Sequence, residues 1–277
     1  MVPGPSEDDR ILPFTRVVAA VVIAILVLAF IVLFLSPNDT DRRFAWTIQP
    51  SMTAMLMGAG YGSALYFFVR VVTERRWHRV ALGFIPTTVF TWMMLGATFL
   101  HSEKFRHGSA PFLLWLWIYL VTPLLVPAVW FVNRSHDPGT REEDDPSYPS
   151  WMRPAMAAAG VGMSLIAAWM YVLPASAISV WPWMLTPLTA RAVAAFVALP
   201  GVGWLMIASD ERWSSARVLL GTISIGLVLL LVAVARAWNE FDHRSAFTYV
   251  YVAGLVGTLA AVGALGAWMH GRVAGGA

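Results

Sequence analysis

The chain has 277 residues, of which 58% are hydrophobic and only 13% are charged, and its formal net charge is +3. A soluble domain carries roughly a quarter charged residues, so this composition excludes both an ordinary soluble domain and a disordered chain. The absence of cysteine excludes disulfides, iron–sulfur clusters and thiol catalysis.

Eight stretches of 17 to 24 residues contain no Asp, Glu, Lys, Arg or His. A helix rises about 1.5 Å per residue, so roughly 20 residues cross a hydrocarbon core of about 30 Å. Such a helix satisfies its backbone hydrogen bonds internally, as lipid requires. We therefore predict an all-α polytopic membrane protein with eight transmembrane helices, within residues 17–35, 51–69, 80–100, 111–132, 154–173, 192–208, 218–235 and 246–269.

The loop charges predict an orientation. Eight spans place both termini on one side, and 12 of the 19 arginine and lysine residues lie on that side, with seven on the other. Cytoplasmic loops carry the excess of positive charge. We therefore expect a multi-pass protein of the cell inner membrane with both termini in the cytoplasm.

The chain matches itself at a shift of 136 or 137 residues, mostly at scarce residue types. The matched pairs include Trp46 and Trp183, Pro50 and Pro187, Trp77 and Trp213, Phe105 and Phe241, and His107 and His243. Because each copy has an even number of spans, both copies share one orientation. We predict two parallel four-helix repeats about a pseudo-two-fold axis, at residues 1–133 and 153–277, joined by a cytoplasmic polar linker at 134–152.

The linker contains Asp137-Pro138-Gly139 and the acidic run Glu142-Glu143-Asp144-Asp145. Turn residues and adjacent like charges are typical of a flexible, solvated segment. An alternative is that the acidic run binds a basic partner.

The loop before the last helix of each repeat carries carboxylates and an imidazole close together: Glu103 and His107 in the first, and Glu240, Asp242 and His243 in the second. If the loops met across the axis, glutamates and histidines could hold zinc, iron or manganese. Helix capping by the following Ser109 and Ser245, with acids that complement the helix dipole, explains the same pattern. We predict no metal ligand, and the cofactor is left open.

Arg191 enters apolar surroundings about one turn inside the sixth span. An arginine there is costly unless it extends to the headgroups or forms an ion pair, for which Glu103, Glu240 and Asp242 are candidates. The matched position in the first repeat is Ala54. Symmetry of the scaffold therefore does not require Arg191, and we predict that it binds a ligand together with Trp183 of the preceding interfacial segment.

That segment, Trp-Pro-Trp-Met-Leu-Thr-Pro-Leu-Thr-Ala-Arg at 181–191, resembles one in a family of uncharacterised bacterial multi-pass membrane proteins. The resemblance covers these residues alone. It implies a membrane location and no activity.

Small and aromatic residues within the spans predict packing rather than chemistry. Gly58 with Gly62, and the glycines of the last span (Gly254, Gly257 and Gly263), are expected to let helices approach closely. Trp115, Trp117 and Tyr119 are expected to face lipid or the core. None of the eight stretches holds a carboxylate, which argues against charge-coupled transport.

The leading hypothesis is an integral inner-membrane protein with an outward-facing binding surface for a small ligand, a lipid headgroup or a partner protein. Its residues would be Arg191, Glu103, His107, Glu240, Asp242, His243 and Trp183. Two alternatives stay open: a transporter of an uncharged or amphiphilic substrate between the repeats, and a membrane metalloenzyme. The expected partners are the lipid bilayer and a second protein or copy, and no nucleic acid, because anionic lipid accounts for the basic loops.

Overall fold

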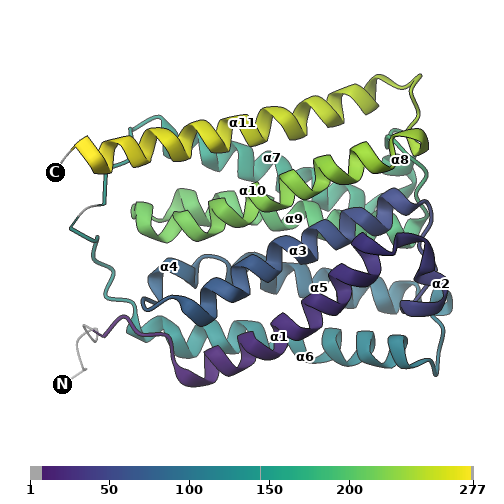
Figure 1. Ribbon diagram of the computed structural model, residues 1–277, viewed down its shortest axis with the longest axis horizontal. Coiled ribbons are helices and arrows are strands. Elements are labelled where there is room, and N and C mark those ends of the chain that lie inside the picture. The colour runs from purple at the N-terminus through teal and green to yellow at the C-terminus, as the bar shows by residue number, and fades with distance from the viewer. Residues whose placement is uncertain (1–7, 144, 276–277) are drawn as a thin grey trace.

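The computed structural model describes residues 8–143 and 145–275, and this part of the chain forms helices and no strand. It contains eight helical spans long and apolar enough to cross a membrane, which confirms the predicted class. Figure 1 shows them lying side by side and roughly parallel. They are α1 (Pro13–Phe30, extended by a π-helical turn, Ile31–Leu35), α3 (Ser51–Thr73), α4 with α5 (His78–Ala81 and Phe84–Leu100), α6 (Ala110–Asn133), α7 (Met152–Val172), α9 (Pro187–Ser209), α10 (Trp213–Arg236) and α11 (Ala246–Gly275).

The two helix starts predicted from capping residues are confirmed. Ser109 caps α6, where its Oγ accepts the N–H of Phe112 at 3.3 Å. At α11, Ser245 Oγ accepts the N–H of Phe247 at 3.3 Å. These bonds satisfy N–H groups that the first turn of a helix leaves without an internal partner.

The centre of the bundle consists of α3, α5, α9 and α10. Helix α3 packs against α1 and α10, while α9 packs against α7 and α5; α6 covers α5 and α11 covers α10. Figure 1 shows α11 along one edge of the bundle, with α1 and α6 along the other. We call the end where α1 begins and α11 ends the termini end. The far end carries the short helices α2 (Thr40–Arg43) and α8 (Pro174–Ile178).

Two glycines of α3 allow its close approach to neighbouring helices, as predicted. A Cβ on Gly58 would lie 2.7 Å from the backbone N of Phe34, and one on Gly62 would lie 2.8 Å from the side chains of Leu229 and Phe30. In contrast, a Cβ at Gly254, Gly257 or Gly263 would meet nothing within 4 Å. The expectation that these glycines make close contacts is therefore wrong within this chain.

The linker is bound to the bundle, contrary to the expectation of a flexible, solvated segment. Glu142 makes two bonds of 2.8 Å with the Arg79 guanidinium. Asp145 accepts both the N–H and the hydroxyl of Ser214, at 2.8 and 2.6 Å. Ion pairs and helix capping thus hold the linker at the termini end. Asp144 of the acidic run lies outside the described residues.

This attachment is expected to depend on pH. Hydrogen bonding from Arg79, reinforced by the charges of Arg79, Arg76 and His78, lowers the pKa of Glu142 from 4.5 to about 2. A carboxyl with a lowered folded-state pKa contributes stability above its unfolded pKa and loses it as the pH falls toward the folded value.

We therefore expect Glu142→Gln to lower the free energy of unfolding in detergent by about 2 kcal/mol at pH 7. The difference from the unsubstituted protein should shrink as the pH falls from about 4.5 toward 2. Denaturant titrations across that range measure it. Glu143→Gln, at an exposed neighbouring position, is the matched control. A penalty from Glu142→Gln that does not change with pH would contradict the assignment.

Candidate functional site

In the structure, the predicted far-end acids do not converge on one site. Glu240 accepts the N–H groups of Ser51 and Met52, at 3.2 and 2.7 Å, and the Ser51 hydroxyl at 2.6 Å. It thereby caps α3 of the other half. Asp242 accepts the N–H of Arg244 at 2.9 Å, and Glu103 is exposed.

The two histidines of the predicted site, His107 and His243, likewise make separate contacts and do not meet at one site. His107 lies with Nε2 2.8 Å from the Ser102 carbonyl oxygen, and the His243 ring lies 4.8 Å from that of Trp238. Within the described part of the chain, no group of three or more His, Cys, Asp or Glu side chains could hold a metal ion. The structure therefore offers no support for a metalloenzyme.

Arg191 joins three helices rather than pairing with an acid. Its Nε donates to the carbonyl of Tyr171 in the last turn of α7 at 3.0 Å, and its Nη1 lies 2.7 Å from Nε2 of His101, which follows α5. It makes no ion pair with a carboxylate of residues 8–143 or 145–275, so the candidate pairs with Glu103, Glu240 and Asp242 are not formed. Burial and then the positive charge of Arg191 lower the pKa of His101. The neutral imidazole can accept the guanidinium N–H.

We expect Arg191→Ala to lower the free energy of unfolding by about 2 kcal/mol, since hydrogen bonds from a charged group contribute roughly 1.5–3 kcal/mol. It should also raise the pKa of His101, because one cause of its depression is removed. Denaturant unfolding and an NMR titration of the imidazole measure the two effects. Arg244→Ala, at an exposed far-end position, is the control. A His101 pKa that does not move would refute this role.

Trp183 is a packing residue of the far end. It is 3% exposed, its Nε1 donates to Thr53 Oγ1 at 2.8 Å, and its ring contacts those of Phe241 and Tyr251. A side chain so enclosed cannot form part of an open binding surface.

Asp9, His78 and Ser214 stand in the carboxylate–imidazole–hydroxyl order of serine nucleophile enzymes. His78 Nδ1 lies 2.5 Å from Asp9 Oδ2, and its Nε2 lies 3.0 Å from Ser214 Oγ. However, Ser214 is only 2% exposed, and its hydroxyl donates to Asp145. The hydroxyl is therefore inaccessible and already engaged, and the group ties together the N-terminal segment, α4, the linker and α10.

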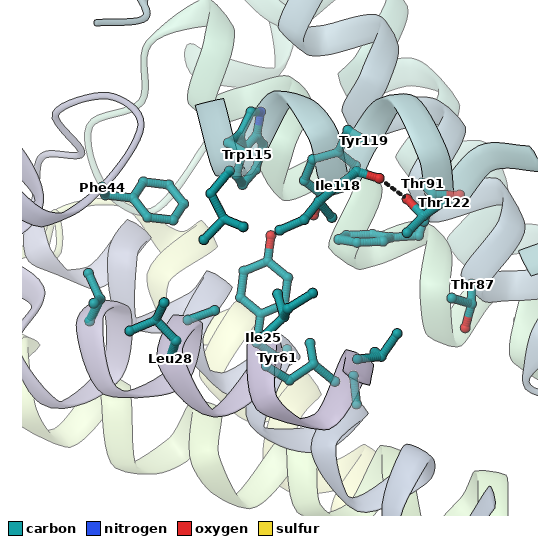
Figure 2. A pocket seen from close by; sticks show the side chains of 18 of the residues that line it. Ile25, Leu28, Phe44, Tyr61, Thr87, Thr91, Trp115, Ile118, Tyr119 and Thr122 are labelled. Atoms are coloured by element: carbon teal, nitrogen blue, oxygen red, sulfur yellow. Dashed lines mark hydrogen bonds between the residues drawn. The ribbon is translucent and has the colours of Figure 1, made fainter. Parts of the chain in front are cut away.

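A cavity of about 380 Å³ lies between α1, α3, α5 and α6 and reaches α9; we call it the α1/α6 cavity. Figure 2 shows Ile25 and Leu28 of α1 facing Trp115, Ile118 and Tyr119 of α6 across it. Pro111 and Val126 of α6 both line it, and they are about 22 Å apart along the helix at about 1.5 Å per residue. Its size and its mostly apolar walls are typical of small-molecule sites.

The α1/α6 cavity reaches the outer surface of the bundle between α1 and α6. Two lining residues, Leu28 of α1 and Leu114 of α6, are 50% and 42% exposed. At the termini end the two helices are joined, because Asn133 Nδ2 donates to Thr15 Oγ1 at 2.6 Å and Asn133 Oδ1 accepts the N–H of Leu12 at 3.2 Å. Toward the far end, the α1/α6 cavity lies between the two helices, within the length of each that is apolar enough to span a membrane.

Most of the polar side chains that line this cavity carry a hydroxyl group. Tyr61 of α3 and Tyr119 of α6 are 6% and 3% exposed, and their hydroxyl oxygens are 2.7 Å apart. The charged lining residue, Arg43, lies at the far end, 3.6 Å from the carboxylate of Asp39.

The α1/α6 cavity was not predicted from the sequence. Trp115 and Tyr119 are buried and Trp117 is 67% exposed, as expected for aromatic residues that face the core or lipid. The available signal was Tyr61, a phenol in the middle of the uncharged second span between Gly58 and Gly62. Its partner lies 58 residues away, on a helix that sequence periodicity does not align with α3.

Comparisons of the chain with protein-family models, with curated proteins and with solved structures give no match. The function of this protein is therefore inferred from the geometry of the α1/α6 cavity.

Proposed function

We propose that this integral membrane protein binds one uncharged or weakly polar, lipid-like molecule in the α1/α6 cavity. The observation that carries this proposal is an apolar cavity within the membrane-spanning part of the bundle that reaches lipid between two helices. A molecule dissolved in the bilayer could enter between α1 and α6 without crossing water.

The charge distribution supports an uncharged body for this molecule. Arg43, at the far-end rim, is already close to Asp39, and its side chain is 58% exposed. A buried anion deeper in the cavity would lack a cationic partner, and burial of an unpaired charge costs several kcal/mol.

The alternative hypothesis, a transporter, predicts a substrate pathway between the two repeats. The α1/α6 cavity instead lies among four helices of the first half, with Phe196 and Leu199 of α9 as its contribution from the second half. Between the halves, a Cβ on Gly60 of α3 would lie 2.2 Å from the Phe196 ring. This contact favours a binding role over a passage between the halves.

We also infer that the chain arose by duplication, with the termini end in the cytoplasm. Matched contacts support the duplication: in each half a tryptophan ring stands edge-on to a phenylalanine ring, at 5.0 Å for Trp46 and Phe105 and 5.1 Å for Trp183 and Phe241. The basic excess in the loops supports the orientation. Membership of the bacterial family suggested by the segment at 181–191 stays a prediction.

Photolabelling of the purified protein in detergent tests the proposed function. The probe is hexadecanol with a diazirine on its chain, and peptide mass spectrometry locates the label. We expect labelling on α1 and α6, near Leu28 and Leu114, that saturates and is displaced by excess plain hexadecanol. Labelling that does not saturate and spreads equally over the lipid-facing surfaces of α7 and α11 would overturn the proposal.

A further inference from the structure

The paired hydroxyls of Tyr61 and Tyr119 lie about halfway across the bundle. Tyr61 is ten residues from the start of α3 and Tyr119 is nine residues from the start of α6, so both lie roughly 14–15 Å from the far end. The hydrocarbon core is about 30 Å thick, which places the pair near its middle.

The pair has one hydroxyl hydrogen in excess. Two hydroxyl groups bring two hydrogens, and the bond of 2.7 Å between them uses one. Among residues 8–143 and 145–275, neither hydroxyl has another hydrogen-bond partner. A buried donor without an acceptor costs roughly 1–3 kcal/mol. Each tyrosine lines the cavity, and in Figure 2 the ring of Tyr61 projects into it with the hydroxyl toward α6.

Other donors along the walls are already engaged. The hydroxyls of Thr87, Thr91 and Thr122 donate to backbone carbonyls at 2.7 to 2.9 Å, and Trp115 Nε1 donates to Thr98 Oγ1 at 2.9 Å. Among the side chains of these walls within the membrane-spanning segments, the free hydrogen-bond donor is therefore the remaining hydroxyl hydrogen of the tyrosine pair.

Aromatic rings surround that point. The Tyr61 ring is edge-on to those of Phe196 and Phe90, at 5.2 and 6.3 Å, and Trp115 lies 4.3 Å from Tyr119. Aromatic walls favour a flat conjugated ring, which they contact by stacking and edge-to-face packing. At the positions matched by a shift of 136 or 137 residues, the second half has Val197 or Ala198 in place of Tyr61, and at a shift of 136 it has Leu255 in place of Tyr119. The scaffold alone therefore does not need them.

We propose that the ligand of the α1/α6 cavity carries a carbonyl on a flat conjugated ring, the chemistry of a quinone, and that the Tyr61–Tyr119 pair donates a hydrogen bond to that carbonyl. An apolar tail on the ring would leave between α1 and α6. This inference rests on the proposed function and specifies the class of its ligand.

The test compares two compounds with the same fused-ring carbon skeleton, menadione, which carries carbonyls, and 2-methylnaphthalene, which does not, as competitors of the diazirine-hexadecanol label. We expect menadione to bind the unsubstituted protein about tenfold more tightly, since one net hydrogen bond contributes about 1.4 kcal/mol, or tenfold. The double variant Tyr61→Phe with Tyr119→Phe should lose that preference. Each single variant should keep it, because the remaining hydroxyl still donates, and Tyr251→Phe, outside this cavity, is the control.

The outcomes separate the two proposals. Equal competition by both compounds, or a menadione preference that survives in the double variant, would overturn the quinone inference while saturable labelling still supported a lipid-like ligand. If the labelling itself does not saturate, the proposed function fails as well. The comparison in the unsubstituted protein decides the inference even if the double variant does not fold.

Discussion

Ala64→Trp is expected to abolish saturable labelling by diazirine-hexadecanol, with at least about a tenfold loss of apparent affinity. Ala64 lines the α1/α6 cavity on α3, so an indole there would occupy the space in which the ligand is proposed to lie. Because no side chain of this protein fills that space and its walls are apolar, the added ring gains contacts rather than displacing packed protein atoms. The thermal midpoint of unfolding should therefore stay the same or rise.

The matched control is Ala168→Trp, which adds the same ring at an exposed position on α7. It should leave the saturable labelling of α1 and α6 unchanged. If Ala64→Trp were labelled as strongly and as saturably as the unsubstituted protein, the ligand would bind elsewhere. A large loss of stability would instead mean that the indole is forced against the packed side of α3, and Ala29→Trp, from the α1 wall, would then repeat the test.

Arg212→Ala should produce the largest loss of stability, about 3–5 kcal/mol, which is typical when one partner of a buried ion pair is removed. Arg212 is 8% exposed and binds Asp137 of the linker at 2.6 and 2.9 Å and Asp210 at 2.7 Å. Burial is the largest single influence and would raise the pKa of both carboxyls. The side-chain hydrogen bonds from Arg212, a backbone N–H bond to each carboxylate and the positive charge of Arg212 together outweigh burial and lower both pKa values. The substitution leaves two partly buried acids without their cation.

Denaturant unfolding in detergent measures the loss, and hydrogen exchange of residues 134–150 shows whether the linker detaches. Arg217→Ala is the control, since Arg217 is exposed on α10, which begins directly after Arg212, and forms no ion pair within the described part of the chain. If Arg212→Ala left the hydrogen exchange of the linker unchanged, Glu142 and Asp145 would be sufficient to hold the linker without Arg212.

The membrane-spanning elements follow directly from the amino-acid sequence. The uncharged stretches predict all eight spans, because the desolvation cost of a charge in lipid acts on each segment independently of its neighbours. Helix starts are predictable for a similar reason: Ser109 and Ser245 act within one turn of their own positions. The close approach at Gly58 is also local, because the absence of a Cβ permits it whichever helix packs there.

The hydrogen-bond and ion-pair partners of the charged side chains could be identified only from the tertiary structure. Nothing local to Arg191 distinguishes a carboxylate partner from His101 and the carbonyl of Tyr171, since these candidates lie on segments distant in sequence. The composition of the acidic linker predicts a solvated segment. In the tertiary structure, however, α4 packs against α10, and this packing places Arg79 and Ser214 next to the linker.

The amino-acid sequence by itself determined that the helices lie in lipid, that the fold is helical, and where α6 and α11 begin. Each of these properties depends on the free energy of a single segment. Only the tertiary structure decided that α1 and α6 separate to leave a cavity and that the Tyr61 and Tyr119 hydroxyls meet inside it. Both features depend on how apolar helices of similar composition pack against one another, and lipid is as apolar as the faces it covers. Hydropathy therefore cannot distinguish a wall of the cavity from a surface that faces the bilayer.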